Sequence, residues 1–350
     1  MPAPESGAVL DVRGLTISFS TYGGRVQAVR GVDFHLNRGE AIAIVGESGS
    51  GKSVTSKAVM GILAKNATIE KGDILYGGKD LAKLTEDQFA KIRGRRIGLI
   101  FQDPLSALNP IMRIGKQIAE ALHMGGACGR GETRERVLAL MESVGIPDPA
   151  KRYNQYPFQF SGGMRQRIVI AIALANDPEI LICDEPTTAL DVTIQARILE
   201  LIIQLKKERN LSIVFITHDL GVVANMADRV YVMYAGRIVE TGTTDEIFYE
   251  PAHPYTWALL SSIPDMETKE KLQAIRGTPP NMLFPPEGDA FASRNPQAME
   301  IDFKRQPPFF RLSATHCAAT WRLHPKAPGS AMPEILSKRI RRMKEEHDAD

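Results

Sequence analysis

Cysteine and long apolar runs are both scarce in this sequence of 350 residues. Its 3 cysteines, Cys128, Cys183 and Cys317, lie far apart and form no CxxC pair, which argues against a disulfide framework and favours a reducing compartment. No stretch approaches the ~18 apolar residues of a membrane-spanning helix. The first residues also lack the basic and then apolar pattern of a secretory signal. We therefore expect a cytosolic protein, with attachment to other components left open.

The sequence has no excess of charge of one sign. It contains 43 basic and 41 acidic residues, for a net charge of +2, and this balance argues against a general nucleic-acid binder, which needs a strong basic excess. Hydrophobic residues make up 43% and charged residues 24%, which excludes wholesale disorder. At roughly 100–200 residues per domain, the length predicts two domains, or one large domain with an appendage.

Short apolar segments alternate with longer segments of helical spacing. The short ones are almost wholly apolar, as are strands buried on both faces of a parallel sheet. This alternation predicts an α/β fold. The predicted buried strands are 40–45, 97–101, 180–183 and 212–217, and the predicted helices are 53–63, 114–122, 132–144, 163–175 and 193–208.

The two ends of the chain follow other patterns. Residues 9–18 and 28–36 alternate apolar and polar side chains, which predicts an antiparallel sheet with one face exposed to solvent. Residues 231–239 are interpreted as a hairpin. Prolines cluster after about residue 250 and predict an irregular extension. The last charged residues are interpreted as a solvated helix, with a membrane or partner contact as the alternative.

The strongest motif is Gly46-Glu47-Ser48-Gly49-Ser50-Gly51-Lys52-Ser53. It matches G-x-x-x-x-G-K-[ST] and lies between a predicted strand and a predicted helix, as a phosphate-binding loop does. Glycines let successive backbone N–H groups point at phosphate oxygens, and the helix N-terminus adds partial positive charge. Lys52 would reach the β- and γ-phosphates, and the Ser53 hydroxyl would bind Mg²⁺. A chance glycine-rich loop would not explain the flanking elements.

Two further segments fit nucleotide hydrolysis. The apolar run 180–183 ends in two carboxylates: Asp184 would hold the Mg²⁺ shell through water, and Glu185 would polarise the attacking water. Ser161 and the two glycines after it open a predicted helix and form an N-terminal anion site. Taken alone, the first segment could be an acidic turn without a metal, and the second could be an ordinary helix cap. Together with loop 46–53 they become much stronger signals of a site for phosphate groups and Mg²⁺.

The ordered motifs resemble those of the ATP-binding-cassette (ABC) ATPases over residues 8–260. The resemblance implies an α/β fold of the P-loop NTPase class and ABC-cassette type, with an antiparallel β subdomain and a helical subdomain at about 103–170. It also implies a C-terminal extension at 261–330, of the kind found in peptide permeases, and a charged tail at 331–350. ATP and Mg²⁺ are the implied cofactors.

The resemblance also implies roles for single residues. Lys52 and Glu185 would act in catalysis with Gln102, which would sense the γ-phosphate and Mg²⁺, and with His218, which would contact the γ-phosphate. Asp191 would lie at the seam between two cassettes. The expected contacts of ATP are Tyr22, Gly46, Ser48, Gly49, Ser50, Gly51, Lys52, Ser53, Gln102, Ser161, Gly162, Gly163 and Asp191. The expected Mg²⁺ contacts are Ser53, Gln102 and, through water, Asp184.

Two details of this assignment depart from the family pattern or stay open. Tyr22 is our choice for the aromatic side chain that stacks on adenine, and Phe19 is its rival; either would otherwise belong to the core. Phe160 and Met164 replace the commoner leucine and glutamine around the Ser-Gly-Gly core of the family signature. Because that core is kept, the resemblance still implies contact with a nucleotide bound to a second cassette.

The resemblance implies several partners. In this family two cassettes enclose each ATP, with the phosphate loop of one facing Ser161 and Gly163 of the other. A second ABC ATPase subunit is therefore implied; it is either a second copy of this chain or a paralogue, and the resemblance favours a paralogue. Because no membrane helices are fused to the cassette, the chain resembles importer ATPases, which implies two transmembrane permease subunits and an extracellular solute-binding protein. It also implies a peripheral position on the cytoplasmic face of the plasma membrane, and no nucleic acid.

Finer resemblance points to the peptide-importer branch. The segments His253-Pro254-Tyr255-Thr256 and Gly277-Thr278-Pro279-Pro280 are similar to those of oligopeptide and dipeptide permease ATPases, above all the D-type ATPases of Gram-positive oligopeptide permeases. Import of oligopeptides is implied, and a dipeptide, nickel or other solute permease is the alternative. DNA-repair ATPases interrupt the cassette with a long coiled coil, and ribosome-associated relatives usually carry two cassettes. Neither feature is found in this sequence.

One departure concerns iron. Many members of this branch carry four cysteines in the extension that resemble an iron–sulfur ligand set. The corresponding positions here are Asp289, Asn295, Asp302 and Thr320, and Cys317 is out of register. Because such clusters are usually held by thiolates, we predict no iron–sulfur cluster. The extension is expected to be held instead by the packing of Phe291, Phe303, Phe309, Phe310 and Trp321.

Overall fold

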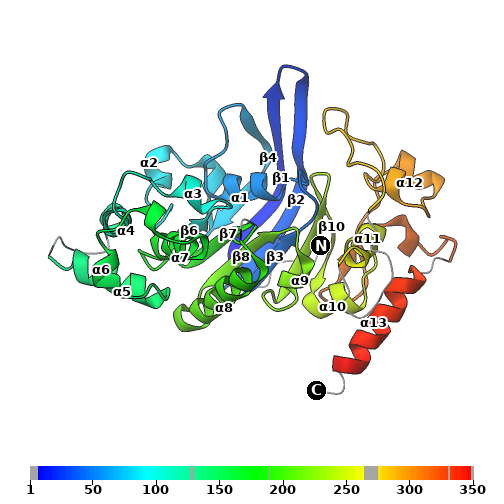
Figure 1. Ribbon diagram of the computed structural model, residues 1–350. Coiled ribbons are helices and arrows are strands. Elements are labelled where there is room, and N and C mark those ends of the chain that lie inside the picture. Colours follow the sequence, from blue (N-terminus) through cyan, green and yellow to red (C-terminus); the bar gives the residue numbers. More distant parts are fainter. Residues whose placement is uncertain are drawn as a thin grey trace. The chain divides into compact units, whose positions relative to one another are not determined.

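The computed structural model describes residues 7–126, 129, 131–188, 190–263, 275–329 and 332–347, which places Cys128 outside the described residues. The chain divides into two compact units (Figure 1). The first comprises Met1–His35, Ile42–Ala82 and Thr217–Asp350, and the second comprises Leu36–Ala41 and Lys83–Ile216. The phosphate loop and the extension belong to the first unit. The expected segments 8–260, 261–330 and 331–350 stay a prediction.

An antiparallel sheet opens the first unit, as the alternating pattern predicts. Its strand order is β2-β1-β4-β5. In β1 the apolar residues Leu10 and Ile17 are fully buried, and Ile17 lies opposite Ile69 of β4. The strands are β1 (Ala8–Thr21), β2 (Gly24–Asn37), β4 (Ala67–Tyr76) and β5 (Lys79–Asp80).

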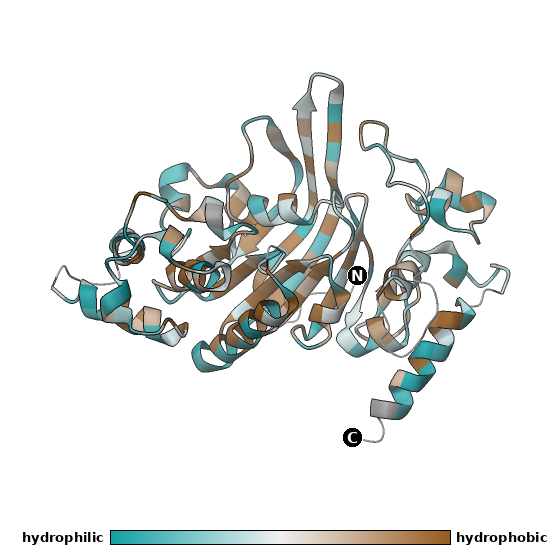
Figure 2. Cartoon of the chain, in the orientation of Figure 1, coloured by the Kyte–Doolittle hydropathy of each residue, from teal (hydrophilic) through white to brown (hydrophobic). Residues whose placement is uncertain are grey.

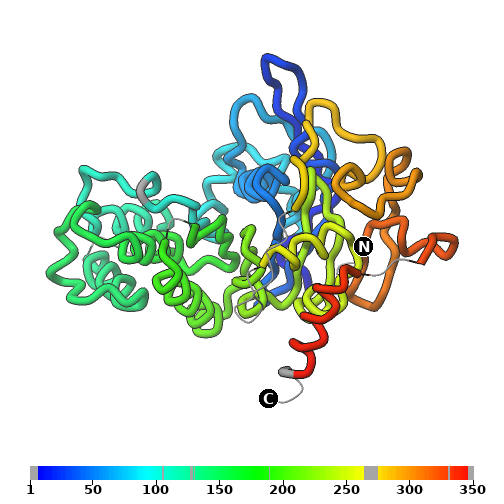
Figure 3. Tube along the Cα trace, turned by 45° about the vertical axis from the view of Figure 1, so that its right-hand side comes forward, coloured from blue at the N-terminus to red at the C-terminus, as the bar shows by residue number. Residues whose placement is uncertain are grey.

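The first unit also contains strands in the order β11-β12-β10-β9-β3. Strand β3 (Ala41–Val45) runs parallel to β9 (Arg229–Tyr234), and β10 (Arg237–Thr243) returns antiparallel to β9. Ala235 and Gly236 turn this hairpin with positive φ angles of 45° and 79°. Strand β12 (Cys317–Ala318) pairs antiparallel with β10, and β11 (Phe310–Arg311) pairs antiparallel with β12. The extension, orange in Figure 3, thus continues the sheet of the cassette, which its fading periodicity did not predict.

Helices of the first unit pack on this sheet. Helix α13 (Glu334–His347) contacts α10 (Thr244–Tyr249) and α11 (Pro254–Ser261). Its apolar residues Leu336 and Ile340 enter the core, while the rest of the helix is largely hydrophilic (Figure 2). The chain's expected charged tail is therefore an amphipathic helix with one face packed. The other elements are α1 (Lys52–Val59), α9 (Leu220–Val223), α12 (Glu300–Lys304) and the 3₁₀ turns Ala292–Arg294 and Trp321–Leu323.

The aromatic packing expected in the extension is only partly observed. Phe291 is 2% exposed and enters the core of the first unit, and Phe310 meets Trp321 edge to face at 6.5 Å between ring centroids. Phe303, however, is 56% exposed. The expectation for Phe303 was wrong because α12 turns this side chain to solvent, while Asp302, the residue before it, is buried.

Parallel strands form the centre of the second unit, in the order β8-β7-β6. Every residue of β7 (Ile180–Asp184) and β8 (Ser212–Thr217) is buried, which confirms strands covered on both faces. β6 spans Ile97–Ile100. The helices are α2 (Glu86–Phe89), α3 (Pro104–Ala107), α4 (Ile114–Gly125), α5 (Thr133–Ser143), α6 (Pro149–Arg152), α7 (Gly162–Ala173) and α8 (Val192–Arg209), with 3₁₀ turns at Leu81–Lys83 and Pro157–Gln159.

Most predicted helices are found within a few residues of their expected ends. Helix α1 is the clearest exception, because it ends at Val59 rather than near residue 63. Gly61 follows with a φ of 61°, a left-handed conformation that commonly ends helices. Within the described ranges, no helix combines the length and apolar character that crossing a bilayer requires.

Candidate functional site

The phosphate loop connects β3 to α1 in the first unit. Its glycines are dictated by close backbone contacts: a Cβ at Gly46 would lie 2.0 Å from the carbonyl oxygen of Met233, and one at Gly51 would lie 2.5 Å from that of Ala28. Gly51 is also the N-cap residue of α1, with a left-handed φ of 104°, and has no side chain with which to cap the first turn. The loop is therefore held in a shape that only glycine allows at these positions.

Lys52 points back into its own loop. Its Nζ donates to the carbonyl oxygens of Gly46, at 2.6 Å, and Glu47, at 3.0 Å, and the residue is only 4% exposed. The ammonium is thus held inside the loop by backbone carbonyl oxygens. The expected contact of Lys52 with the β- and γ-phosphates stays a prediction.

Strand β7 brings two carboxylates to its end in the second unit. Asp184 is 7% exposed, and Glu185 has a positive φ of 48°. A non-glycine residue in this region is uncommon and is found preferentially at functional sites. The Glu185 N–H donates to the carbonyl oxygen of Ile216 in β8 at 2.9 Å, which fixes the sharp turn of the chain after β7.

The carboxylate of Glu185 has two side-chain donors. Gln102, which follows β6, donates from Nε2 to Glu185 Oε2 at 3.0 Å, and Thr188 donates from Oγ1 to the same oxygen at 3.0 Å. The structure therefore brings together Gln102 and Glu185, which the sequence assigned to one site. Thr188 was missed by sequence reasoning, and its position three residues after the carboxylate in the same turn was the available signal.

Ser161, Gly162 and Gly163 begin helix α7. Ser161 is its N-cap residue, and its side chain accepts a hydrogen bond from the N–H of Met164 at 3.4 Å. A Cβ at Gly163 would lie 2.5 Å from Cγ2 of Ile194 in α8, whereas one at Gly162 would meet Leu190 at an ordinary 3.5 Å. Phe160, which replaces the commoner leucine, is 3% exposed and serves as a core residue.

Two further expected residues lie at element boundaries. Asp191 is the N-cap residue of α8 and accepts a hydrogen bond from the N–H of Ile194 at 3.0 Å. Its side chain therefore has a local structural role besides the one expected at a cassette seam. His218 is exposed and directly follows β8, and Asp219 after it caps the short helix α9.

The two aromatic candidates for adenine lie on the β1–β2 hairpin. Tyr22 is fully exposed in the turn between the strands, with a relative exposure of 113%. Phe19 is half-buried in β1, opposite Ala67 of β4. An exposed ring is available to stack on a base, and a half-buried ring also supports the sheet, so both stay candidates.

The three residues expected to hold Mg²⁺ each offer an oxygen atom. Ser53 supplies a hydroxyl, Asp184 a carboxylate and Gln102 an amide, and these hard ligands fit Mg²⁺ better than softer metals. Ser53 lies in the first turn of α1, and Asp184 ends β7.

The four positions that the resemblance aligns with an iron–sulfur cysteine set, Asp289, Asn295, Asp302 and Thr320, form a buried polar set. Their exposed fractions run from 1% to 8%, and each side chain accepts a hydrogen bond from the extension's own backbone. The accepting groups are Asp289 Oδ1 (from Phe291 N), Asn295 Oδ1 (from Gln297 N), Asp302 Oδ2 (from Met299 N) and Thr320 Oγ1 (from Arg322 N). Burial raises the pKa of Asp302, with Asp289 adding to the shift. Carboxylate, amide and hydroxyl groups so engaged are not a thiolate ligand set.

Comparison with known proteins gives the family. Residues 29–188 match the family "ABC transporter", and residues 239–301 match "Oligopeptide/dipeptide transporter, C-terminal region". The chain is 57% identical over 338 residues to the oligopeptide transport ATP-binding protein OppD of Bacillus subtilis, covering 96% of this chain and 94% of that protein. It is 56% identical over 340 residues to the dipeptide transport ATP-binding protein DppD of Lactococcus lactis, covering 96% and 97%.

Solved structures give the same fold. The ATP-binding cassette MJ0796, in a dimeric post-hydrolysis state bound to ADP and Pi, superposes with a TM-score of 0.60 at 27% identity, covering 67% of this chain and 98% of that one. CbiO1 from Clostridium perfringens, part of the ABC transporter complex cbiONQ, has a TM-score of 0.59 at 29% identity, covering 70% and 92%. These matches confirm the expected cassette fold and ATPase class. The chain therefore belongs to the ABC transporter ATP-binding proteins, in the oligopeptide/dipeptide importer branch.

Proposed function

We propose that this protein hydrolyses ATP to power the import of oligopeptides through separate transmembrane subunits. The observation that carries the proposal is that one chain has two features suited to the two kinds of nucleotide contact. Loop 46–53 has the glycine-dictated shape and inward-facing lysine of a phosphate cradle, and Ser161 begins α7 as a second anion-binding helix start. Each kind of contact would serve a different cassette of a pair.

Nucleotide binding begins at the phosphate loop. Its backbone N–H groups and the N-terminus of α1 would surround the β- and γ-phosphates. Lys52 Nζ would exchange its bonds to the carbonyl oxygens of Gly46 and Glu47 for phosphate oxygens. Because the ammonium is already at the concave side of the loop, little side-chain ordering remains to be done on binding.

Glu185 would act on the water that attacks ATP. Its carboxylate would accept a hydrogen bond from that water, whose oxygen then bonds to the γ-phosphorus. The bond from the γ-phosphorus to the β–γ bridging oxygen breaks, and ADP and phosphate leave. Gln102 and Thr188 donate to one carboxylate oxygen of Glu185 and so help to fix the direction of this side chain. His218 would contact the γ-phosphate.

Mg²⁺ would be held by Ser53, by Gln102 and, through water, by Asp184. When bound, the ion neutralises charge on the phosphates as they react. Asp184 would orient the water that it shares with the ion. It is suited to this role because it is nearly buried at the end of β7, which fixes the direction of its side chain.

A second cassette would complete each nucleotide site. Ser161, Gly162 and Gly163 of one chain would contact the γ-phosphate held by its partner, and Asp191 would lie at the seam between them. The matched relative MJ0796 is described as a dimer, which supports this arrangement. We infer a paralogous partner cassette, two permease subunits, an external solute-binding protein and a peripheral position on the cytoplasmic membrane face.

The transported solute is inferred from relatives. OppD of Bacillus subtilis is named for oligopeptides and DppD of Lactococcus lactis for dipeptides, at 57% and 56% identity. Oligopeptides are therefore the first proposal and dipeptides the second.

The test is reconstitution in lipid vesicles. The chain, its partner cassette and the permease subunits, co-purified from membranes, are incorporated with the solute-binding protein. ATP hydrolysis should rise on addition of a short oligopeptide probe of about four to five residues. Lys52→Ala should abolish this rise, because it weakens nucleotide binding. A preparation that neither retains ATP nor releases phosphate would contradict the proposal. A response to dipeptides alone would select the second solute class.

A further inference from the structure

The phosphate loop is held by a side chain of the C-terminal extension. Arg294 donates from Nη1 to Glu47 Oε2 at 2.5 Å and from Nη2 to Glu47 Oε1 at 3.0 Å. Glu47 is the second residue of the loop, directly after Gly46. The pair is therefore bidentate, which is the strongest and most directional form of an arginine–carboxylate contact.

Arg294 is itself rigidly held. Its side chain is 3% exposed, its Nε donates to the carbonyl oxygen of Arg276 at 2.7 Å, and its Nη1 also donates to Tyr234 Oη at 3.1 Å. The guanidinium lies 5.7 Å from the centre of the Tyr234 ring and 5.8 Å from that of Phe291. The bond to Glu47, before the other contacts, raises the pKa of Arg294.

The backbone of Glu47 is engaged on both sides of this ion pair. Its N–H donates to Tyr255 Oη at 2.8 Å, and Tyr255 is fully buried. Its carbonyl oxygen accepts from Lys52 Nζ at 3.0 Å. Carboxylate, N–H and carbonyl of one loop residue thus each have a partner, and Arg294 is linked to the phosphate-binding lysine through a single residue.

The extension touches a second edge of the nucleotide region. The N–H of Gln27 in β2 donates to the carbonyl oxygen of Met282 at 3.1 Å. A Cβ at Gly24 would lie 3.4 Å from Leu283. The same β1–β2 hairpin carries Phe19 and Tyr22, so the extension contacts both the loop for phosphate and the hairpin proposed for adenine.

We propose that Arg294 is a positioning residue for nucleotide binding, through which the C-terminal extension sets the conformation of the phosphate loop. This rests on the proposed function of loop 46–53 as the ATP phosphate site. Arg294 fixes Glu47, Glu47 fixes the turn that starts the loop, and Lys52 is held against that turn. The extension therefore acts on ATP affinity and has little part in the hydrolysis step.

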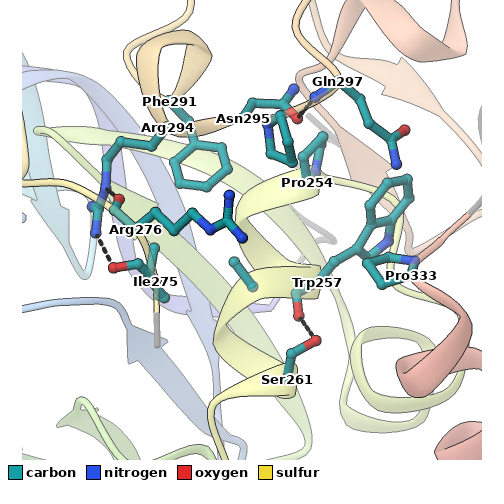
Figure 4. Close-up of a pocket in the computed structure, with 12 residues that line it drawn as sticks. Pro254, Trp257, Ser261, Ile275, Arg276, Phe291, Arg294, Asn295, Gln297 and Pro333 are labelled. Carbon is teal, nitrogen blue, oxygen red and sulfur yellow. Dashed lines mark hydrogen bonds between the residues drawn. The ribbon is translucent and has the colours of Figure 1, made fainter. Parts of the chain in front are cut away.

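A matched control lies in the same part of the molecule. Arg276 lines a pocket of about 330 Å³ together with Arg294, Phe291 and Trp257. In Figure 4 the Arg276 side chain points into the pocket, whereas that of Arg294 turns away from its centre. Arg276 supports Arg294 through its backbone carbonyl, which a side-chain substitution keeps. Arg276→Gln thus removes a neighbouring arginine and leaves the contact with Glu47 intact.

The experiment measures binding of a fluorescent ATP analogue to the full chain, and KM and kcat of the assembled transporter. Arg294→Gln, Glu47→Gln and the double variant should each weaken nucleotide binding by about tenfold, because charge-assisted bidentate bonds of this kind are lost. The double variant should bind no more weakly than either single one. KM for ATP should rise, kcat at saturating ATP should stay within about twofold, and Arg276→Gln should match wild type.

Glu47→Gln removes the loop side of the ion pair and keeps every bond from Arg294 to the extension. Because the nearly buried Arg294 cation then lacks its carboxylate, the melting temperature should also fall, so ATP affinity is measured at a temperature at which circular dichroism shows each variant to be folded. Wild-type affinity in Arg294→Gln or in Glu47→Gln would overturn the proposal. So would a defect in kcat alone. A wild-type chain that binds no nucleotide would instead contradict the proposed function.

Discussion

Gln102 donates a hydrogen bond of 3.0 Å to the Glu185 carboxylate, and the two residues are brought together from the ends of neighbouring parallel strands. The carboxyl ends of such strands are where α/β proteins commonly place ligand sites. Glu185 also has a left-handed φ of 48°, so both its backbone and its side chain are constrained. A carboxylate held in this way can orient a water molecule with little reorganisation during the reaction.

Glu185→Gln should abolish ATP hydrolysis and keep ATP binding. The amide has nearly the same shape and still accepts from Gln102, but it is a very weak base, so we expect a loss of at least about 100-fold in turnover. The measurements are phosphate release by the assembled transporter and ATP retained by the closed pair of cassettes. Wild-type turnover would show that another group polarises the water.

The local motifs were predictable, and the contacts between distant segments were not. Loop 46–53, Asp184 and the start of α7 follow from spacing along the chain, because each functional group lies within one turn of the element that places it. The carboxyl ends of β6 and β7 adjoin because the strands are parallel, which the apolar runs predict.

Arg294 shows why the rest was missed. It lies in a proline-rich segment without periodicity, and it meets Glu47 only because the extension folds back on the cassette. Strands β11 and β12 have two residues each, which is too short for an alternating pattern. Phe303 and Phe291 are both phenylalanines, and only the three-dimensional packing decides that Phe303 is exposed and Phe291 is buried.

Purified protein should contain no stoichiometric iron or acid-labile sulfide. Asp289, Asn295, Asp302 and Thr320 occupy the four positions that the family resemblance assigns to cysteine ligands, and their oxygen atoms accept hydrogen bonds from backbone N–H groups. Neither these groups nor the displaced Cys317 supply the thiolates of such clusters. Anaerobic purification, metal analysis and an absorption spectrum make the measurement. Iron with sulfide at cluster stoichiometry would contradict it.

Gly163→Ala should destabilise the chain by about 1–3 kcal/mol, because its Cβ would overlap Ile194 and force α7 and α8 apart. Gly162→Ala is the matched control, since its Cβ would make an ordinary contact with Leu190 and alanine favours a helix. Urea unfolding of both variants gives the comparison. Equal stability of the two variants would mean that the α7–α8 contact relaxes without cost.

Tyr22→Ala should weaken binding of ATP and leave binding of inorganic triphosphate unchanged. Loss of a stacked aromatic ring costs about 1–3 kcal/mol per base, and triphosphate has no base to stack. Phe19→Ala is the companion variant, because Phe19 is half-buried in β1. If Phe19→Ala shows the selective loss and Tyr22→Ala does not, adenine stacks on Phe19.

Acid should destabilise the first unit through His35. This side chain is 7% exposed, and its Nε2 lies 2.5 Å from Nη1 of Arg229. Burial first, and then the charge of Arg229, lower the pKa of His35 from 6.5 to about 4, although Asp11 opposes the shift. Above pH 6.5 both folded and unfolded chains hold a neutral imidazole. As the pH falls from 6.5 towards 4, the unfolded chain takes up a proton that the folded chain resists, so stability is lost.

Between pH 7 and pH 5 this histidine should account for about 1–2 kcal/mol of the loss in unfolding free energy. His35→Gln keeps an acceptor for Arg229 and cannot titrate, so its stability should fall less than that of wild type over this interval. His324→Gln, at an exposed position, should follow wild type. Urea unfolding at both pH values makes the measurement. If His35→Gln and wild type lose the same free energy, the folded chain protonates His35 as readily as the unfolded chain does, and the contact with Arg229 must be relieved in solution.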